Sequence, residues 1–247
     1  MKQLKFLFPM PLLATLLFAT LSTVHADVFM KQKRHIDGFT MMGQTQPAKD
    51  SFVDTWFATD KIRSDQDKSS TIVRLDKNVL YIIDHDKKTY LERPFNLNNP
   101  INEKMPGNLG INIIVTPANE NKKINNWTCK KYLQKMDIMG MSMTSEVWAT
   151  EDIRMDYEVY SKFLSASFRQ NPAMRADMEK LIKEMKKIKG VQVLTVTSNV
   201  VMGQTMKTVQ ELVDFKEGTA PVGIFDLPAG YKKVKIGGTG YYQGRQQ

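Results

Sequence analysis

Apolar and polar residues alternate over much of the chain, in short runs separated by polar turns. Runs of this kind, rich in β-branched and aromatic residues, are typical of antiparallel strands. We expect strands at 51–65, 70–76, 78–84, 88–92, 110–116, 128–138 and 142–150. Residues 93–109 contain Pro94, Pro100 and Pro106, so this stretch is expected to be a long loop. The first part of the chain is therefore predicted to form an antiparallel meander.

The apolar period then changes to that of a helix. Within 155–170, four large side chains fall on one helical face: Tyr157, Tyr160, Leu164 and Phe168. A second helix follows directly, because Asn171 is a preferred N-cap, Pro172 suits the first turn and Gly190 suits a left-handed C-cap. The sequence therefore predicts a helical hairpin that ends at Gly190.

The second helix carries a single apolar stripe, while its other face is basic. The stripe consists of Met174, Met178, Leu181, Ile182, Met185 and Ile188. A stripe of this kind can face a protein core, a membrane surface or a bound lipid. Since strands precede and follow the helices, we expect the stripe to face the concave side of a sheet.

Strands return after the hairpin, at 191–201 and 206–215, and a turn is expected at 228–230. The predicted fold class is α+β: a large curved antiparallel sheet, or open half-barrel, covered by the inserted helical hairpin. No linker interrupts the composition, so residues 27–236 are expected to form a single domain. The tail, 237–247, is rich in Gly, Tyr and Gln and is expected to be disordered.

The N-terminal 1–26 has the plan of a secretory signal peptide. Lys2 and Lys5 precede an apolar run at 6–21, and the small residue Ala26 ends the Val-His-Ala boundary. The run has 16 residues, whereas a membrane-spanning helix needs about 20. We therefore expect cleavage near Ala26 and a periplasmic or secreted protein.

The chain is basic, with a formal net charge of +9, or +7 once the two lysines of the signal segment are removed. A basic surface suits anionic membranes or nucleic acid, and it also aids solubility. An exported protein without a nucleic-acid-binding motif is a poor candidate for nucleic acid. An anionic membrane surface therefore remains a candidate partner, and nucleic acid does not.

Few residues suggest catalysis or metal binding. The mature chain has two histidines, His35 and His85, and one cysteine, Cys129, without the spacing of a zinc site. We expect His85 to be a turn residue and Cys129 to be buried and inert. A Ser/His/Asp triad stays open, since its members need not be close in sequence. The prediction is a protein that is not an enzyme and has no cofactor.

Methionines cluster at Met136, Met139, Met141 and Met143. On one extended strand the last three would share a face, and clustered thioethers select Cu(I). However, Gly140 can break the alternation, and methionine also fills adaptable apolar surfaces. Lining of an apolar interior is the preferred interpretation, and a copper module is the alternative.

Several short motifs resemble an uncharacterised family of bacterial exported proteins, a domain of unknown function. They are "WFATDKIRSD", "YIIDHDKKTYLE", "WTCKKYLQK", "EVWATEDI" and "GIFDLPAGYKKV". The family's fold is similar to that of the lipoprotein carriers LolA and LolB. The resemblance implies an open half-barrel, with helices as a lid over a hydrophobic cavity that takes acyl chains in relatives of known role.

The predicted function is that of a cell-envelope carrier or sensor for a lipid, acyl chain or lipoprotein. The helical stripe would contact the ligand through Met174, Met178, Leu181, Ile182 and Met185. Near the cavity mouth, Lys180, Lys183 and Lys187 would attract an anionic head group. The alternatives are a structural or interaction protein whose sheet is filled by its own side chains, and a methionine-based copper module.

Overall fold

A computed structural model describes most of the chain after the predicted signal peptide. The described residues are 26–41, 44–95, 111–138, 141–153, 178–201 and 204–235. The signal peptide, the predicted helix at 155–170, the first turns of the second helix and the tail lie outside these residues.

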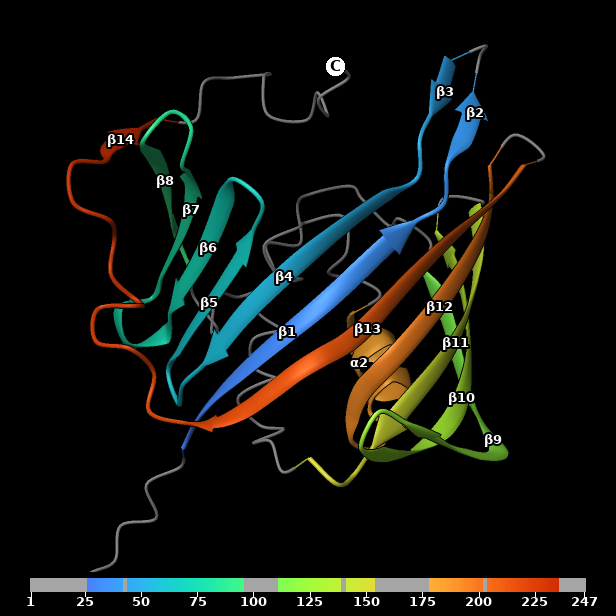
Figure 1. Ribbon diagram of the computed structural model, residues 1–247. Helices are drawn as coiled ribbons and strands as arrows, with labels where there is room; N and C mark the ends of the chain where they lie inside the picture. Colours follow the sequence, from blue (N-terminus) through green and yellow to red (C-terminus); the bar gives the residue numbers. More distant parts are fainter. Residues whose placement is uncertain are drawn as a thin grey trace, which may run out of the picture.

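One twelve-stranded sheet dominates the fold (Figure 1). Its strands are β1 (Asp27–Ile36), β4 (Lys49–Phe57), β5 (Lys61–Gln66), β6 (Ser69–Arg74), β7 (Val79–Asp84), β8 (Thr89–Pro94), β9 (Asn112–Ile124), β10 (Trp127–Ile138), β11 (Met141–Thr150), β12 (Val191–Val201), β13 (Gln204–Gly218) and β14 (Lys232–Val234). They lie in the order β14-β8-β7-β6-β5-β4-β1-β13-β12-β11-β10-β9. A small hairpin of β2 (Phe39–Met41) and β3 (Gln44–Gln46) extends from β1 and β4.

The strands from β4 to β13 follow the predicted runs with some differences, whereas β1, β2, β3 and β14 were not predicted, and β9 continues to Ile124, beyond the run predicted at 110–116. The run predicted at 51–65 forms two strands, β4 and β5, because the Ala58 N–H donates to the Lys61 carbonyl (2.8 Å) and closes a tight turn between them. In addition, β14 pairs in parallel with β8, whereas the other neighbouring strands are antiparallel. The 3₁₀ turn η1 (Leu75–Lys77) links β6 to β7.

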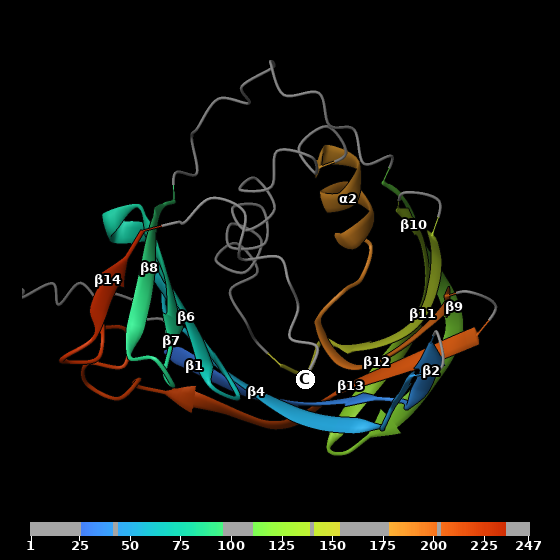
Figure 2. The ribbon, with the colours of Figure 1, turned by 90° about the horizontal axis from the view of Figure 1, so that it is seen from above.

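The sheet is strongly curved and open, with β14 and β9 at its two edges (Figure 2). The long strands β1 and β13 pair over ten residues of β1 in the middle, and so join the two halves of the molecule. The prediction of a large curved antiparallel sheet is confirmed. The predicted hairpin cover is not shown: the described residues contain one short α-helix, α2 (Met178–Met185).

The helix α2 lies inside the curve of the sheet (Figure 2) and ends earlier than predicted. The Lys187 N–H donates to Glu184 O and the Ile188 N–H to Met185 O, so the last turn tightens to an i→i−3 pattern. Gly190, the predicted C-cap, has a φ of +90° and instead leads the chain into β12. The prediction that the α-helix runs to this glycine was therefore wrong by one turn.

The C-terminal segment crosses the outer face of the sheet over β5–β8 before it adds β14 (Figure 1). The Arg63 guanidinium donates to the carbonyl of Ile224 (2.9 Å), and Arg74 donates to the carboxylate of Asp226 (3.1 Å). Among the described residues, no helix is long and apolar enough to cross a membrane.

Candidate functional site

The register of the sheet defines which residues share its concave face. Residues directly opposite each other on neighbouring strands point to the same side. One such row crosses the middle of the sheet through Val147, Thr195, Gln210, Arg34 and Ser51. Val147 packs in one cluster with Leu181 of α2. Because α2 lies inside the curve, this row belongs to the concave face.

A second row, here called the apolar row, crosses the N-terminal half of the same face. It consists of Val28, Phe57, Ile62, Val73 and Leu80, each directly opposite the next. Val28 lies six residues before Arg34 on β1, and an even spacing along a strand keeps both on one face. The apolar row therefore lies on the concave face, and each of its five residues is buried.

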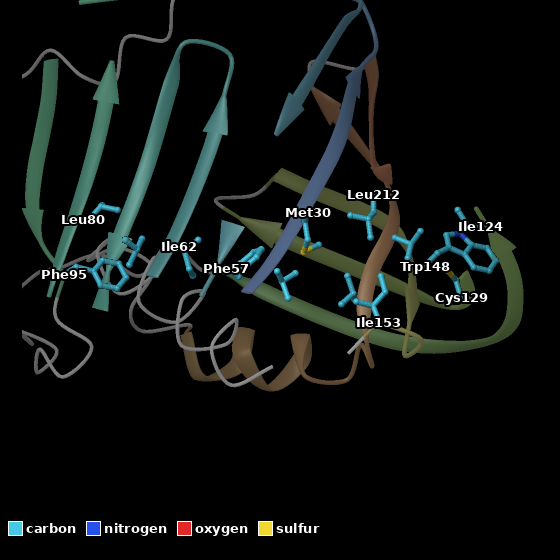
Figure 3. Packing of buried hydrophobic residues seen from close by; sticks show 14 residues of the cluster. Met30, Phe57, Ile62, Leu80, Phe95, Ile124, Cys129, Trp148, Ile153 and Leu212 are labelled. Carbon is cyan, nitrogen blue, oxygen red and sulfur yellow. The ribbon is translucent and has the colours of Figure 1, made fainter. Parts of the chain in front are cut away.

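The apolar row belongs to a cluster of 14 buried residues that extends across both halves of the sheet (Figure 3). Beyond the row the cluster contains Met30, Phe95, Ile124, Cys129, Trp148, Ile153, Val191, Val193 and Leu212. Burial of apolar area on this scale is the main stabilising contribution to the sheet.

A separate cluster, here called the helix cluster, joins α2 to strands β9–β11. Its buried members are Ile113, Val115, Tyr132, Val147, Ala149, Leu181 and Ile188. Met136, Ile182 and Met185 are partly buried and pack against them. The apolar stripe of the helix therefore faces the concave side of the sheet, and its border remains partly accessible to solvent.

Polar contacts hold α2 against β9, the edge strand of the sheet. The Val115 N–H donates to Glu184 Oε2 (2.8 Å), and Lys180 Nζ donates to Asn112 Oδ1 (2.6 Å). Lys187 Nζ lies 2.7 Å from the Glu184 carboxylate. The hydrogen bonds from Lys187 and from Val115 lower the pKa of Glu184. The helix thus satisfies a main-chain donor on a strand edge that would otherwise be open to pairing.

The predicted ligand-contact residues of the stripe are brought together only in part. Leu181 is 4% exposed within the helix cluster, while Ile182 and Met185 line its border. Met178 is the first residue of α2, and Met174 lies outside the described residues.

The three lysines expected at a cavity mouth have different surroundings. As described above, Lys180 contacts Asn112, and Lys187 contacts Glu184. Lys183 is exposed to solvent. Two of the three lysines therefore hold the helix to the sheet or to itself. Spacing along the helix could not reveal these partners, because one of them belongs to a distant strand.

The described methionines of the β10–β11 hairpin are on the concave face. Met136 is directly opposite Met143, in line with the helix cluster. Met141 is opposite Ile138 and 55% exposed. Met139 lies outside the described residues. The described methionines thus continue the apolar surface beyond the helix.

The outer face carries a polar network that resembles a catalytic site at first sight. His85 Nε2 lies 2.6 Å from Ser70 Oγ, and Ser70 donates a short hydrogen bond to Asp65. His85 Nδ1 lies 2.9 Å from the Tyr231 hydroxyl. In a Ser/His/Asp triad the acid orients the histidine, whereas here it binds the serine. Ser70 is also 1% exposed, and the network ties Tyr231 of the C-terminal segment to the sheet.

The single cysteine is buried, as predicted. Cys129 is 0% exposed, and burial, with a smaller contribution from the charge of Asp152, raises the pKa of its thiol. A thiol in this state is a poor nucleophile. His85 is the first residue of the turn after β7, also as predicted. Among the described residues, no three His, Cys, Asp or Glu side chains are arranged to hold a metal ion.

Comparison with known proteins gives one family and several distant structures. Two structures of PNGF-II, in space groups C2 and P21, are 13% and 14% identical, with TM-scores of 0.38, and cover 85% and 81% of this chain. The chain spans about a third of their length (31% and 30%). A domain from Vibrio parahaemolyticus, described as an outer membrane lipoprotein-sorting protein domain, is 7% identical with a TM-score of 0.30. That match covers 81% of this chain and 89% of the domain.

These TM-scores are too low for the structures to decide either the fold or the function. The comparison with curated proteins gave no match. The family described as "Domain of unknown function (DUF4412)" matches residues 36–231, which is most of the chain. This match confirms the expected resemblance to a domain of unknown function: the chain belongs to the DUF4412 family.

Proposed function

We propose that the chain is a cell-envelope protein that binds the acyl chain of a lipid or lipoprotein on the concave face of its sheet, as a carrier or sensor. One observation carries this proposal. The apolar row in one half of the sheet and the helix cluster in the other both face the inside of the curved, open sheet, and α2 packs against the side of β9–β11 (Figure 2). The apolar stripe of α2 and the apolar row thus face the same interior.

The energy available from one acyl chain is sufficient. Sixteen methylenes gain roughly 13 kcal/mol at about 0.8 kcal/mol each. Association and ordering cost roughly 4–15 kcal/mol. Micromolar binding needs about −8 kcal/mol, so it is reached when the costs are at the low end of that range. A preformed, rigid sheet favours low costs, because few protein side chains must be ordered.

A second candidate is a structural or interaction protein whose concave face is filled by its own side chains. The burial of the apolar row favours it, because Ile62 and Val73 are each 1% exposed. The two candidates differ in one measurable property. Protein purified without detergent and extracted with organic solvent yields stoichiometric lipid by mass spectrometry if the first is correct, and none if the second is correct.

A pair of substitutions on α2 tests where the ligand lies. Ile182 lies at the border of the helix cluster, and the neighbouring Lys183 is exposed. Ile182→Glu places a charge beside the proposed ligand, which is unfavourable without a partner. We expect it to lose co-purified lipid with a small fall in melting temperature, whereas Lys183→Glu keeps the lipid. Equal lipid content in both variants would mean either that the ligand does not contact Ile182 or that the protein binds no lipid.

The remaining parts of the proposal follow from the sequence. The N-terminal segment supports export by a cleaved signal peptide, with Asp27 as the first mature residue. We propose a role without catalysis, since the outer-face network around His85 holds the C-terminal segment in place. Edman sequencing of protein recovered from the envelope tests the export; retention of Lys2 and Lys5 would contradict it.

A further inference from the structure

Three β-hairpins, β2–β3, β10–β11 and β12–β13, end at the same end of the sheet, and their tips carry no charge (Figure 1). The uncharged segments are 38–48, 138–145 and 190–206, in a chain of which 25% of the residues are charged. Each contains the dipeptide Met-Gly, which lies outside the described residues. The described residues of the three tips, here called the tip rim, are 39–41, 44–46, Ile138, 141–142, 200–201 and 204–205.

The tip rim differs from the turns at the same end of the other half of the sheet. The turn after β5 contains Asp67 and Lys68, and the turn after β7 contains Asp86 and Lys87. Exposed turns of this polar kind are usual. In the tip rim, by contrast, Met141 is 55% exposed and Val200 is 60% exposed. Exposed apolar side chains without neighbouring charges are typical of a surface that binds a partner or a membrane.

The two strands of each hairpin remain paired up to the turn. The last pairs are Met41 with Gln44, Ile138 with Met141 and Val201 with Gln204, and two residues separate the members of each pair. Main-chain groups that are paired within a hairpin leave bulk water at a lower cost than the unpaired groups of an open loop. The tips are therefore suited to the head-group layer of a bilayer.

Two rows cross β10–β13 directly behind the tips. The row on the concave face has no charge: Met136, Met143, Asn199 and Met206. The row on the outer face is Lys135, Thr144, Ser198 and Lys207, each opposite the next. Both lysines are exposed. Between this outer row and the tips, Asp137 is the one charged residue of these strands. The base of the tip rim is therefore weakly basic.

The spacing of the lysines from the tips matches the depth of a head-group layer. Lys207 precedes the tip by three residues, since Gln204 is the last paired residue, and at about 3.3 Å per residue this is about 10 Å. A head-group layer is roughly 5–8 Å thick. Tips whose lysines are level with the head groups would thus reach the start of the acyl chains.

We propose that the tip rim docks on the surface of an anionic lipid bilayer, with Lys135 and Lys207 at the level of the head groups. The net charge of +7 after removal of the signal segment favours this approach. A protein partner is less suitable, because a stable interface buries about 800 Å² of continuous surface on each side. The β2–β3 hairpin forms a sheet of its own, so the tips are separate projections, around which a bilayer can close.

The first test is co-sedimentation of the mature protein with vesicles, either of phosphatidylcholine alone or of phosphatidylcholine mixed with phosphatidylglycerol. We expect binding to both, and tighter binding to the mixture. Val200→Asp should weaken binding to both at least about tenfold, because a charge must enter the bilayer. Its melting temperature should be unchanged, since Val200 is exposed. The matched control is Val222→Asp, at a fully exposed valine of the C-terminal segment, which should bind as the wild type does.

The lysine row is tested by Lys207→Gln. We expect about fivefold weaker binding to the mixed vesicles and unchanged binding to phosphatidylcholine. Loss of binding to both would show that Lys207 does not act through anionic head groups, and would overturn its assigned place.

Insertion of the tips is measured separately, with a polarity-sensitive fluorophore on Val200→Cys. Cys129 is buried and does not compete for the label. We expect the emission to shift to the blue when vesicles are added, and no shift from the same label on Val222→Cys. This variant introduces no charge, so it remains informative if Val200→Asp does not fold.

Three results would overturn the inference: no binding of the wild type to either vesicle, equal weakening by Val200→Asp and Val222→Asp, or a dimer without vesicle binding that Val200→Asp dissociates, which would make the tip rim an interface between two copies. The inference goes beyond acyl-chain binding and does not rest on it. If vesicles do not bind but lipid is extracted from the purified protein, this inference fails alone. If vesicles bind and no lipid is extracted, only the proposed function fails.

Discussion

The chain that follows α2 closely approaches β11. Alanine substitutions at three glycines, with different expected costs in stability, test this approach. Gly190 has a φ of +90°, and a Cβ at this position would lie 1.9 Å from the carbonyl oxygen of Thr150. Gly230 has a φ of +79° but open space around it. At Gly218 a Cβ has open space as well, and the φ is ordinary. Substitution by alanine thus adds strain and a clash at Gly190, strain alone at Gly230, and neither at Gly218.

The magnitudes follow from these geometries. An L-residue forced to positive φ costs about 1–2 kcal/mol, which is the expected effect of Gly230→Ala. At Gly190 the clash is with main chain, which cannot rotate away, so β11 and β12 must move apart. We expect Gly190→Ala to cost more than about 4 kcal/mol, a value reached only by severe packing or backbone faults. Gly218→Ala should be within about 1 kcal/mol of the wild type.

Thermal unfolding followed by far-ultraviolet circular dichroism measures the series. For a domain of this size 1 kcal/mol shifts the melting temperature by about 2–4 °C. We therefore expect Gly190→Ala to melt at least about 8 °C lower, and Gly230→Ala about 2–8 °C lower. Similar values for these two variants would show that the approach of Gly190 to Thr150 does not exist, and that α2 joins β12 by another path.

Three further outcomes are expected from other parts of the fold. The pKa of Glu184 is lowered in the folded chain. The stabilisation of α2 by the ionised carboxylate is therefore complete above the ordinary glutamate pKa, and it is lost as the pH falls through the lower folded pKa. Amide exchange of Val115 should lose protection in that acidic range, and Glu184→Gln should abolish this pH dependence. Cys129 should resist alkylation at pH 8 until the chain unfolds, because its thiol is buried and its pKa raised; rapid labelling of the native protein would contradict its burial. Replacing Met141 and Met143 by leucine should leave Cu(I) binding unchanged, and a micromolar site lost in that variant would support the copper module instead.

Local sequence patterns were sufficient to predict most of the strands. Period-two alternation with β-branched residues predicted β12 with its observed boundaries, 191–201. The same pattern could not separate β4 from β5, since the turn at 58–60 has neither glycine nor proline. The stripe of α2 correctly predicted that Leu181 faces the sheet. The end of the helix was misjudged because Gly190 is needed for its close approach to Thr150 rather than for a cap.

The candidate site depends on contacts between residues distant in sequence. The sequence contains Arg93 and Arg74 as two similar cations, 19 positions apart. Only the path of the C-terminal segment places Asp226 beside Arg74 on the outer face, and only the register of the sheet places Arg93 opposite Leu80 on the concave face. In the same way, Glu184 could not be paired with the main chain of Val115 from spacing along a helix.

The sequence by itself determined the strand-rich composition, the approximate strand boundaries, the apolar face of α2 and the burial of Cys129, because each of these follows from hydrophobicity and periodicity within a few residues. The tertiary structure alone decided that β1 pairs with β13, that β14 runs parallel to β8, and which charged groups are neutralised. A strand edge offers the same main-chain donors and acceptors to every candidate partner, so pairing is chosen by the packing of whole faces rather than by local sequence.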